Sequence, residues 1–248
     1  MLLLVLYSLS GILKAQDEDF NKMVEKIFAG DVEGLTELLD SGIDVNIVSS
    51  NGVTPLILAS SFKDSFEVVK CLVEAGAGIN VTGNRDGRSP LIWAAGVSKE
   101  TTEYLLEKGA DPDIIGNDGT TAVINAVFGI FGGGSFDILD LLIDNGADVN
   151  RTLVNGASNG YTAISYAARN GNPELVSYLI DKGAEINHKT TEGNTPLMLA
   201  AEEGEVKVLE ILLGADADIS LKNNSGLTAL EIAESEGHDE IISLLKQQ

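Results

Sequence analysis

The sequence predicts an all-α solenoid of helix-turn-helix units joined by β-hairpin turns, and two alternating strings predict it. The string G-x-[TS]-[PA]-[LIV] begins at Gly52, Gly87, Gly119, Gly160, Gly193 and Gly226. The string L-[LI]-x-x-G-[AI]-[DE] occurs at 38–44, 105–111, 142–148 and 179–185. Successive glycines of the first string are 35, 32, 41, 33 and 33 residues apart. A period of this length indicates stacked repeats.

Each string has a physical role in the predicted helices. Thr or Ser before Pro or Ala, as in Thr54-Pro55, is typical of a helix start, because the hydroxyl accepts a free backbone N–H and Pro fits the first helical position. The glycine of the second string closes the second helix in the left-handed conformation. Asp216 replaces that glycine in one repeat, and because Asp tolerates this conformation better than most residues, we expect the fold to persist there.

Further motifs carry a family resemblance. Ala-Ala pairs such as Ala167-Ala168 and Ala200-Ala201, and the string Gly237-His238-Asp239-Glu240, fall at fixed places in the period. The chain resembles the ankyrin repeat, which implies a hairpin turn followed by two antiparallel helices in about 33 residues. We expect one ankyrin repeat domain over 16–248, with units at about 17–50, 51–84, 85–116, 117–157, 158–190, 191–223 and 224–248.

The amino terminus is apolar or small over residues 1–13 and turns polar at Lys14. This stretch is shorter than the roughly 20 residues that span a bilayer as a helix. Its length fits a secretory signal with a cleavage site after Ala15, although no basic residue precedes it and Leu13 is bulky for that position. We expect residues 1–15 to be a signal peptide and the protein to be periplasmic or secreted. The alternative is a helix that packs on the end of the domain.

Composition excludes several function classes. The chain has 16 Lys+Arg against 38 Asp+Glu, a formal net charge of −22. Because a protein that neutralises phosphates needs a basic surface, we expect no nucleic-acid partner. One Cys and two His in 248 residues offer few nucleophile–base pairs or metal ligands. We therefore expect no enzyme activity, no cofactor, no metal and no transmembrane segment, and a monomer.

Two insertions interrupt the period in the fourth and fifth units. Four extra residues lie between the helices of the fourth unit, within 128–136, and four more lie in the next hairpin, within 151–158. Insertions in repeat proteins go into loops on the face that often binds. The phenylalanines and the triple glycine of 128–136 predict a mobile apolar loop that contacts a partner. Neutral loop growth is the alternative, because loop length costs little.

The resemblance also implies where a partner is held. In ankyrin repeat proteins the hairpin tips and the concave face of the first helices bind other proteins, so alignment assigns candidate contacts at these positions. The candidates are Phe62, Arg85, Arg88, Thr120, Phe128, Ile130, Phe131, Tyr161, Arg169, Asn170, Glu202 and Glu203. Trp93 and Tyr166, one position before the Ala-Ala pairs, are expected in the core.

These observations predict a non-enzymatic protein–protein interaction module. Residues 192–240 hold twelve acidic residues against Lys207 and Lys222, which favours a partner with a basic patch. Two alternatives stay open at this point. One is a cytoplasmic ankyrin regulator that masks another protein, and the other is a ligand-binding or enzymatic role of the inserted loop 128–136.

Overall fold

The computed structural model describes residues 18–83, 86–153 and 160–248. Within these ranges the chain contains fourteen helices and no strand, as the repeat pattern predicts. The helices form two compact units, which are described separately. Unit 1 extends to Ala147 and unit 2 runs from Asp148 to Gln248. The signal peptide predicted for 1–15, the candidate contact Arg85 and most of the hairpin insertion lie outside the described residues.

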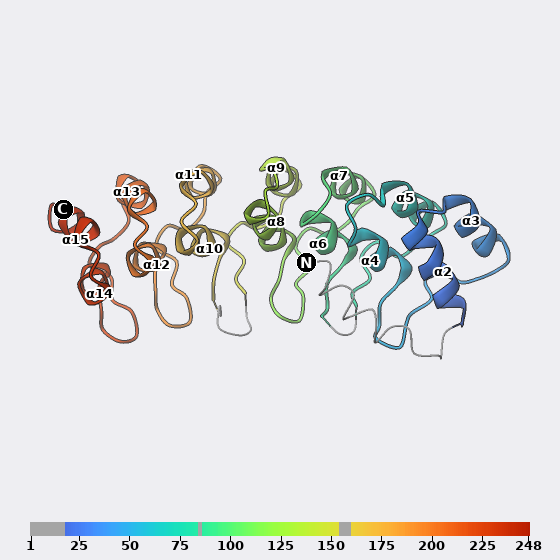
Figure 1. Ribbon diagram of the computed structural model, residues 1–248, viewed down its shortest axis with the longest axis horizontal. Helices are drawn as coiled ribbons and strands as arrows, with labels where there is room; N and C mark the ends of the chain where they lie inside the picture. The colour runs from blue at the N-terminus through green and yellow to red at the C-terminus, as the bar shows by residue number, and fades with distance from the viewer. Residues whose placement is uncertain (1–17, 84–85, 154–159) are drawn as a thin grey trace. The chain divides into compact units, whose positions relative to one another are not determined.

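Unit 1 consists of two layers of helices (Figure 1). The inner layer contains α2 (Glu18–Ala29), α4 (Pro55–Ser60), α6 (Pro90–Ala95) and α8 (Ala122–Phe131). The outer layer contains α3 (Val32–Asp40), α5 (Phe66–Glu74), α7 (Lys99–Glu107) and α9 (Asp137–Asp144). Each inner helix packs against the outer helix that follows it and against the neighbouring inner helices. Leu72, Leu105 and Leu139 of the outer helices are fully buried between the layers.

Unit 2 repeats the same arrangement with three helix pairs. Its inner helices are α10 (Ala163–Arg169), α12 (Pro196–Glu203) and α14 (Ala229–Glu236). Its outer helices are α11 (Pro173–Asp181), α13 (Val206–Gly214) and α15 (Asp239–Leu245). Small residues let the inner helices approach closely: Ala168 and Ala200 are fully buried where α10 packs against α12.

Most of the inner helices begin with the predicted cap. The side chain of the residue before the helix accepts a hydrogen bond from the third backbone N–H at Thr54, Ser89, Thr121, Thr195 and Thr228. Thr162 differs, because its hydroxyl lies 3.0 Å from the Ser165 hydroxyl and makes no such cap. A side-chain hydroxyl three residues into the helix therefore competes for the capping oxygen.

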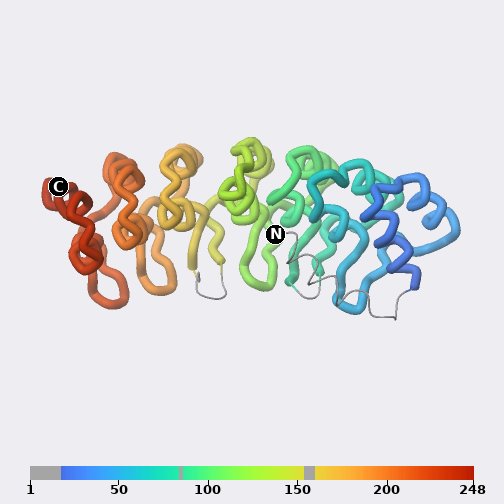
Figure 2. The backbone as a smooth tube through the Cα atoms, in the orientation of Figure 1, coloured from blue at the N-terminus to red at the C-terminus, as the bar shows by residue number. Residues whose placement is uncertain are grey.

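The hairpin turns project from the inner-helix side of each unit (Figure 2). They are closed by pairs of backbone hydrogen bonds: the Thr190 N–H, for example, donates to the Asn194 carbonyl at 3.0 Å, and the Gly193 N–H donates to the Thr190 carbonyl at 2.8 Å. Among the described residues these turns are too short to count as strands, so the predicted β-hairpins are present as turns. Their glycines have positive φ, for example 80° at Gly193.

Two sequence predictions about the scaffold can be checked directly. Asp216 has φ 62°, so it takes the left-handed conformation that the glycines adopt elsewhere. The insertion within 128–136 was predicted to form a loop, and this is wrong for residues 128–131. Helix α8 runs on to Phe131, so the extra residues lengthen the inner helix, and only the residues after it form the turn to α9.

Candidate functional site

The predicted contact residues occupy two surfaces, one in each unit. In unit 1 they are Phe62, Arg88, Thr120, Phe128, Ile130 and Phe131, at a turn tip or near the end of an inner helix. In unit 2 they are Tyr161, Arg169, Asn170, Glu202 and Glu203. The members of each set that are helical stand on inner helices that pack against the outer layer.

Arg88 organises the turn tips of unit 1. Its Nη2 donates to Asp118 Oδ2 at 2.7 Å and to Thr120 Oγ1 at 3.2 Å, and its guanidinium lies 5.0 Å from the centre of the Trp93 ring. Burial disfavours the ionised form of Asp118, but hydrogen bonds from Arg88 and Thr120 outweigh it, so the pKa of this carboxyl lies below its usual value. The cluster links two successive turns through one charged pair.

Two residues of this cluster differ from their predicted roles. Thr120 was predicted to contact a partner, yet it is 1% exposed and instead accepts a hydrogen bond from Arg88. Trp93 was expected in the core, but it is only half-buried, and the Arg88 guanidinium covers its ring. A cation over an indole face is a favourable contact, and it places Trp93 on the surface that faces the turn tips.

The inner-helix ends of unit 1 are apolar. Phe128 and Phe131 of α8 are 39% and 37% exposed, while Ile130 is half-buried. Phe28 at the end of α2 is 48% exposed, and its ring packs edge-on against Phe62 with centroids 5.1 Å apart. Phe28 was not among the predicted contacts because it lies before the first repeat of the glycine string.

A glycine pair permits the extension of α8 beside α6. A Cβ atom at Gly129 would lie 2.8 Å from the carbonyl oxygen of Gly96, so any larger residue would push the two helix ends apart. Their role in the structure is close packing of two inner helices, which keeps Phe128 and Phe131 on a helix.

In unit 2 an arginine again joins two repeats, but here the arginine lies on a helix and the aromatic residue beside it lies in a turn. Arg169 on α10 donates from Nε to Glu203 Oε1 at 3.0 Å and from Nη1 to the Tyr161 hydroxyl oxygen at 3.0 Å. The Tyr161 and Tyr166 rings pack with centroids 5.1 Å apart. Tyr161 was a predicted contact but is 4% exposed, so it supports Arg169 from below. Tyr166, expected in the core, is half-buried.

Acidic side chains gather beyond Arg169. Burial raises the pKa of Glu202, and although Arg169 opposes this effect, Glu203, Glu192 and Glu236 add to it, so its pKa lies above the usual value. The four carboxylates of Glu192, Glu202, Glu203 and Glu236 therefore interact with one another, and the Arg169 guanidinium balances only part of their charge. Asn170, the remaining predicted contact, is exposed and donates to the Tyr166 carbonyl at 2.9 Å, which closes the end of α10.

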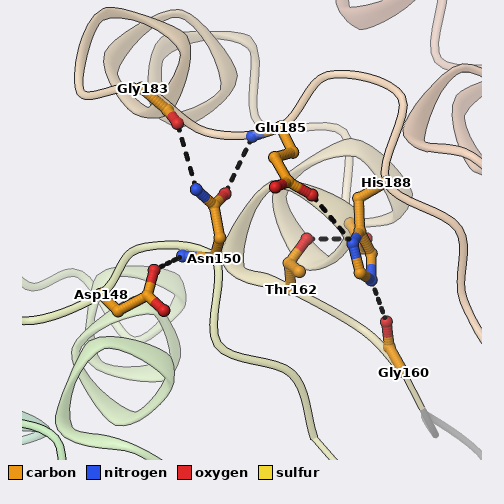
Figure 3. A network of polar contacts seen from close by, with 8 residues as sticks. Asp148, Asn150, Gly160, Thr162, Gly183, Glu185 and His188 are labelled. Atoms are coloured by element: carbon orange, nitrogen blue, oxygen red, sulfur yellow. Dashed lines mark hydrogen bonds and ion pairs between the residues drawn. The ribbon is translucent and has the colours of Figure 1, made fainter.

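A polar network supports this surface at the start of unit 2 (Figure 3). The Asn150 side chain donates to the Gly183 carbonyl at 3.2 Å and accepts from the Glu185 N–H at 2.8 Å. His188 places Nε2 3.0 Å from the Gly160 carbonyl and Nδ1 3.4 Å from Glu185. The network holds the residue before Tyr161, so both His188 and Asn150 have structural roles.

The described part of the chain contains no group of three or more His, Cys, Asp or Glu side chains that could hold a metal ion. Cys71 is half-buried, with Sγ 3.6 Å from the Thr36 hydroxyl, at a groove of about 350 Å³ between α3 and α5. His238 places Nε2 3.1 Å from the Glu202 carbonyl oxygen. None of the helices in the described ranges is both long and apolar enough to cross a membrane.

The comparisons with known proteins agree with the repeat pattern. The family model for ankyrin repeats (3 copies) matches residues 23–116, 84–153, 126–223 and 188–248. The fold is similar to that of the ankyrin repeat domain of Bcl-3, with a TM-score of 0.75, 25% sequence identity and coverage of 91% of this chain and 97% of that one. It is also similar to the human ASB11 ankyrin repeat domain, with a TM-score of 0.73, 24% identity and coverage of 90% and 96%.

Curated relatives match shorter stretches. The chain is 35% identical to human SH3 and multiple ankyrin repeat domains protein 2 over 118 residues, which is 47% of this chain and 6% of that protein. It is 32% identical to the putative E3 ubiquitin-protein ligase XBAT34 of Arabidopsis thaliana over 115 residues, 46% of this chain and 30% of that protein. The chain thus spans a minor part of these relatives. The repeats, their family model and the fold agree that this chain belongs to the ankyrin repeat family, whose repeats are non-enzymatic protein–protein interaction modules.

Proposed function

We propose that this chain binds a partner protein through the exposed side chains at its inner-helix ends and turn tips, and that it does so as a monomer. One observation carries the proposal: the backbone repeats from one inner helix to the next, whereas the exposed side chains differ. Phe128, Arg169 and Glu202 lie at the aligned position near the ends of inner helices α8, α10 and α12, and all three are exposed. Aromatic and Arg side chains are enriched at the energetic centres of interfaces.

A binding experiment tests the surface. Partners are captured from lysate of the native host with the wild-type chain and with Phe128→Ser, Arg169→Ala and Glu202→Gln, and each captured protein is quantified. We expect at least one inner-surface variant to lower recovery about tenfold, the loss typical of a residue at the centre of an interface. Lys108→Ala and Glu174→Gln are matched controls, because both residues are exposed at the outer layer. Equal recovery with all variants would exclude this surface.

We infer further that the partner brings basic residues to unit 2. Glu203, Glu192 and Glu236 act on Glu202 as like charges, and Arg169 is the cation that opposes them. Such a field speeds the encounter with a positively charged partner, and salt screens it. The association rate with the captured partner is expected to fall between low and high salt in wild type. A rate that does not depend on salt would contradict a basic partner.

We propose that the protein is exported after cleavage behind Ala15. The support is the apolar stretch 1–13 followed by a polar, acidic stretch. Amino-terminal sequencing of protein from its native host tests this directly. A mature chain that begins at Gln16 agrees with export, whereas an intact Met1 would favour the alternative, a cytoplasmic ankyrin regulator that masks another protein.

A further inference from the structure

Three successive hairpin turns of unit 1 carry a β-branched residue at one position of the repeat. These residues are Val48, Thr82 and Ile115, and we call them the β-branched row. Each directly precedes the residue whose backbone N–H closes its turn. The closing hydrogen bonds run from Ser49 to the Val53 carbonyl at 3.0 Å, from Gly83 to the Arg88 carbonyl at 3.3 Å and from Gly116 to the Thr120 carbonyl at 2.8 Å.

The β-branched row faces solvent. Val48 and Ile115 are 46% and 44% exposed, and Thr82 is exposed as well. The residues that follow them, Ser49, Gly83 and Gly116, are all buried. Alternation of this kind is typical of an extended chain, whose successive side chains point to opposite faces. The row therefore lies on the outer face of its turns.

Hydrogen bonds join the successive turns that carry the row. Asn46, two residues before Val48, donates to the Gly76 carbonyl at 3.2 Å and accepts from the Gly78 N–H at 2.8 Å. Asn80, two residues before Thr82, makes the same pair of bonds with the Gly109 carbonyl at 3.1 Å and the Asp111 N–H at 2.9 Å. Because neighbouring inner helices lie about 8–10 Å apart, the row spans about 16–20 Å.

The fold does not require apolar residues at this position. In unit 2 the same position holds Thr152, Lys189 and Lys222. The turn after Lys189 closes in the same way, with the Thr190 N–H 3.0 Å from the Asn194 carbonyl. Isolated exposed apolar side chains are common on protein surfaces. A row on joined turns, at a position where lysine is accepted, instead indicates a contact surface.

The surroundings of the row are acidic. Asp44 and Asp111 are exposed, and each lies four residues before a member of the row. In the sequence, the turn segments 44–53, 78–88 and 111–120 contain five Asp against Arg85 and Arg88. Arg88 already pairs with Asp118 at 2.7 Å. An apolar centre with a negative border is complementary to an apolar segment with positive flanks.

We propose that the β-branched row binds an extended segment of the partner protein in which apolar side chains are flanked by Lys or Arg. The inference rests on the proposed partner binding and adds a contact outside the inner-helix ends. About six extended residues cover 20 Å. Three aliphatic side chains offer far less surface than the roughly 800 Å² per partner that a stable complex of two folded chains buries, which favours a short segment over a second copy of this chain.

Selection of peptides from a random library of about twelve residues, displayed on phage, tests the proposal on the full chain. Enriched peptides are expected to contain apolar residues flanked by Lys or Arg. Their affinity should fall about tenfold with Val48→Lys plus Ile115→Lys, because both substitutions remove apolar contact and repel the flanks. Enrichment of acidic or wholly polar peptides only, or an unchanged affinity for the double variant, would overturn the proposal.

Two controls separate this result from other effects. Val81→Lys adds the same charge next to Thr82 but outside the row, so it should change affinity less than twofold. Peptides that lose affinity with Phe128→Ser but not with the double variant would overturn the row and leave the proposed inner surface intact. Sedimentation of the wild-type chain should show a monomer. A dimer that the double variant disperses would mean that a second copy covers the row, and it would also overturn the proposal.

Discussion

The two units use the same scaffold, but the side chains that they expose differ in chemistry. Near the ends of its inner helices, unit 1 exposes Phe128, while unit 2 exposes Arg169 and Glu202. In the described residues, the large apolar side chains that are exposed lie in unit 1, with Leu227 as the exception. Thr121 and Thr195 cap the helices that carry Phe128 and Glu202 in the same way. Backbone architecture and surface chemistry are therefore set by different residues of the repeat.

The two arginine clusters show the same separation. In unit 1 the cation comes from a turn and the aromatic ring from a helix, as Arg88 over Trp93. In unit 2 the ring comes from a turn and the cation from a helix, as Tyr161 under Arg169. In both units the partner carboxylate belongs to the next repeat, Asp118 or Glu203. A cation, a ring and a carboxylate thus tie successive repeats together although their positions are exchanged.

The largest expected effect concerns the glycine contact in unit 1. Gly129→Ala places a Cβ 2.8 Å from the Gly96 carbonyl oxygen, so we expect unfolding free energy to fall by about 2 kcal/mol. Gly214→Ala in unit 2 is the matched change, because its Cβ meets nothing within 4 Å, and it should be neutral or stabilising by up to about 1 kcal/mol. Chemical denaturation followed by the fluorescence of Trp93, the only tryptophan, and by circular dichroism measures both. A stabilising Gly129→Ala would show that the helix ends can separate.

The next effect tests whether the scaffold is equivalent in both units. Asn150 bridges Gly183 and Glu185 in unit 2, and Asn46 bridges Gly76 and Gly78 in unit 1 with contacts of 3.2 and 2.8 Å. Asn150→Ala and Asn46→Ala each remove two hydrogen bonds, so each should lower the unfolding free energy by about 1–2 kcal/mol. Hydrogen exchange of the two units measures the losses separately. A loss in one unit only would break the equivalence.

The sequence was sufficient for the scaffold because its determinants are local. Thr54 and Ser89 cap the helices they precede, and Asp216 takes the conformation of the glycine it replaces. The extension of α8 was missed because Gly129 and the following glycines are typical of a loop. Gly129 packs closely against Gly96, a residue 33 positions earlier, and no local pattern reports such a contact.

The candidate surface was predicted less completely than the scaffold. Alignment placed Thr120 and Tyr161 at exposed positions, but long arginine side chains fold over both, and this depends on rotamers rather than on repeat position. Trp93 and Tyr166 were assigned to the core because each lies one position before an Ala-Ala pair. Each aromatic ring instead packs beside a turn residue of its own repeat, which no spacing rule encodes.

A smaller effect follows from the paired carboxylate of unit 1. The pKa of Asp118 lies below its ordinary value of 3.8, so its stabilising contribution is present above about pH 4 and is lost as the pH falls through the folded-state pKa. Asp118→Asn should therefore lower the unfolding free energy by about 0.5 kcal/mol at pH 7, a value reduced for a partly exposed pair. Denaturation from pH 3 to pH 7 should show the difference shrinking in acid. A constant difference would indicate that the carboxylate charge does not matter.

The smallest effect has the opposite sign and lies in unit 2. The pKa of Glu202 lies above its ordinary value of 4.5, so ionisation costs stability as the pH rises through the interval between these two values. Glu202→Gln should raise the unfolding free energy by about 0.3 kcal/mol at pH 7, with no difference well below pH 4, because this side chain is largely exposed. Glu210→Gln on α13 reports the effect of the amide alone. If Glu202→Gln instead destabilised the chain at pH 7, attraction to Arg169 would outweigh repulsion among the carboxylates. That result would contradict an excess of negative charge at the inner surface of unit 2.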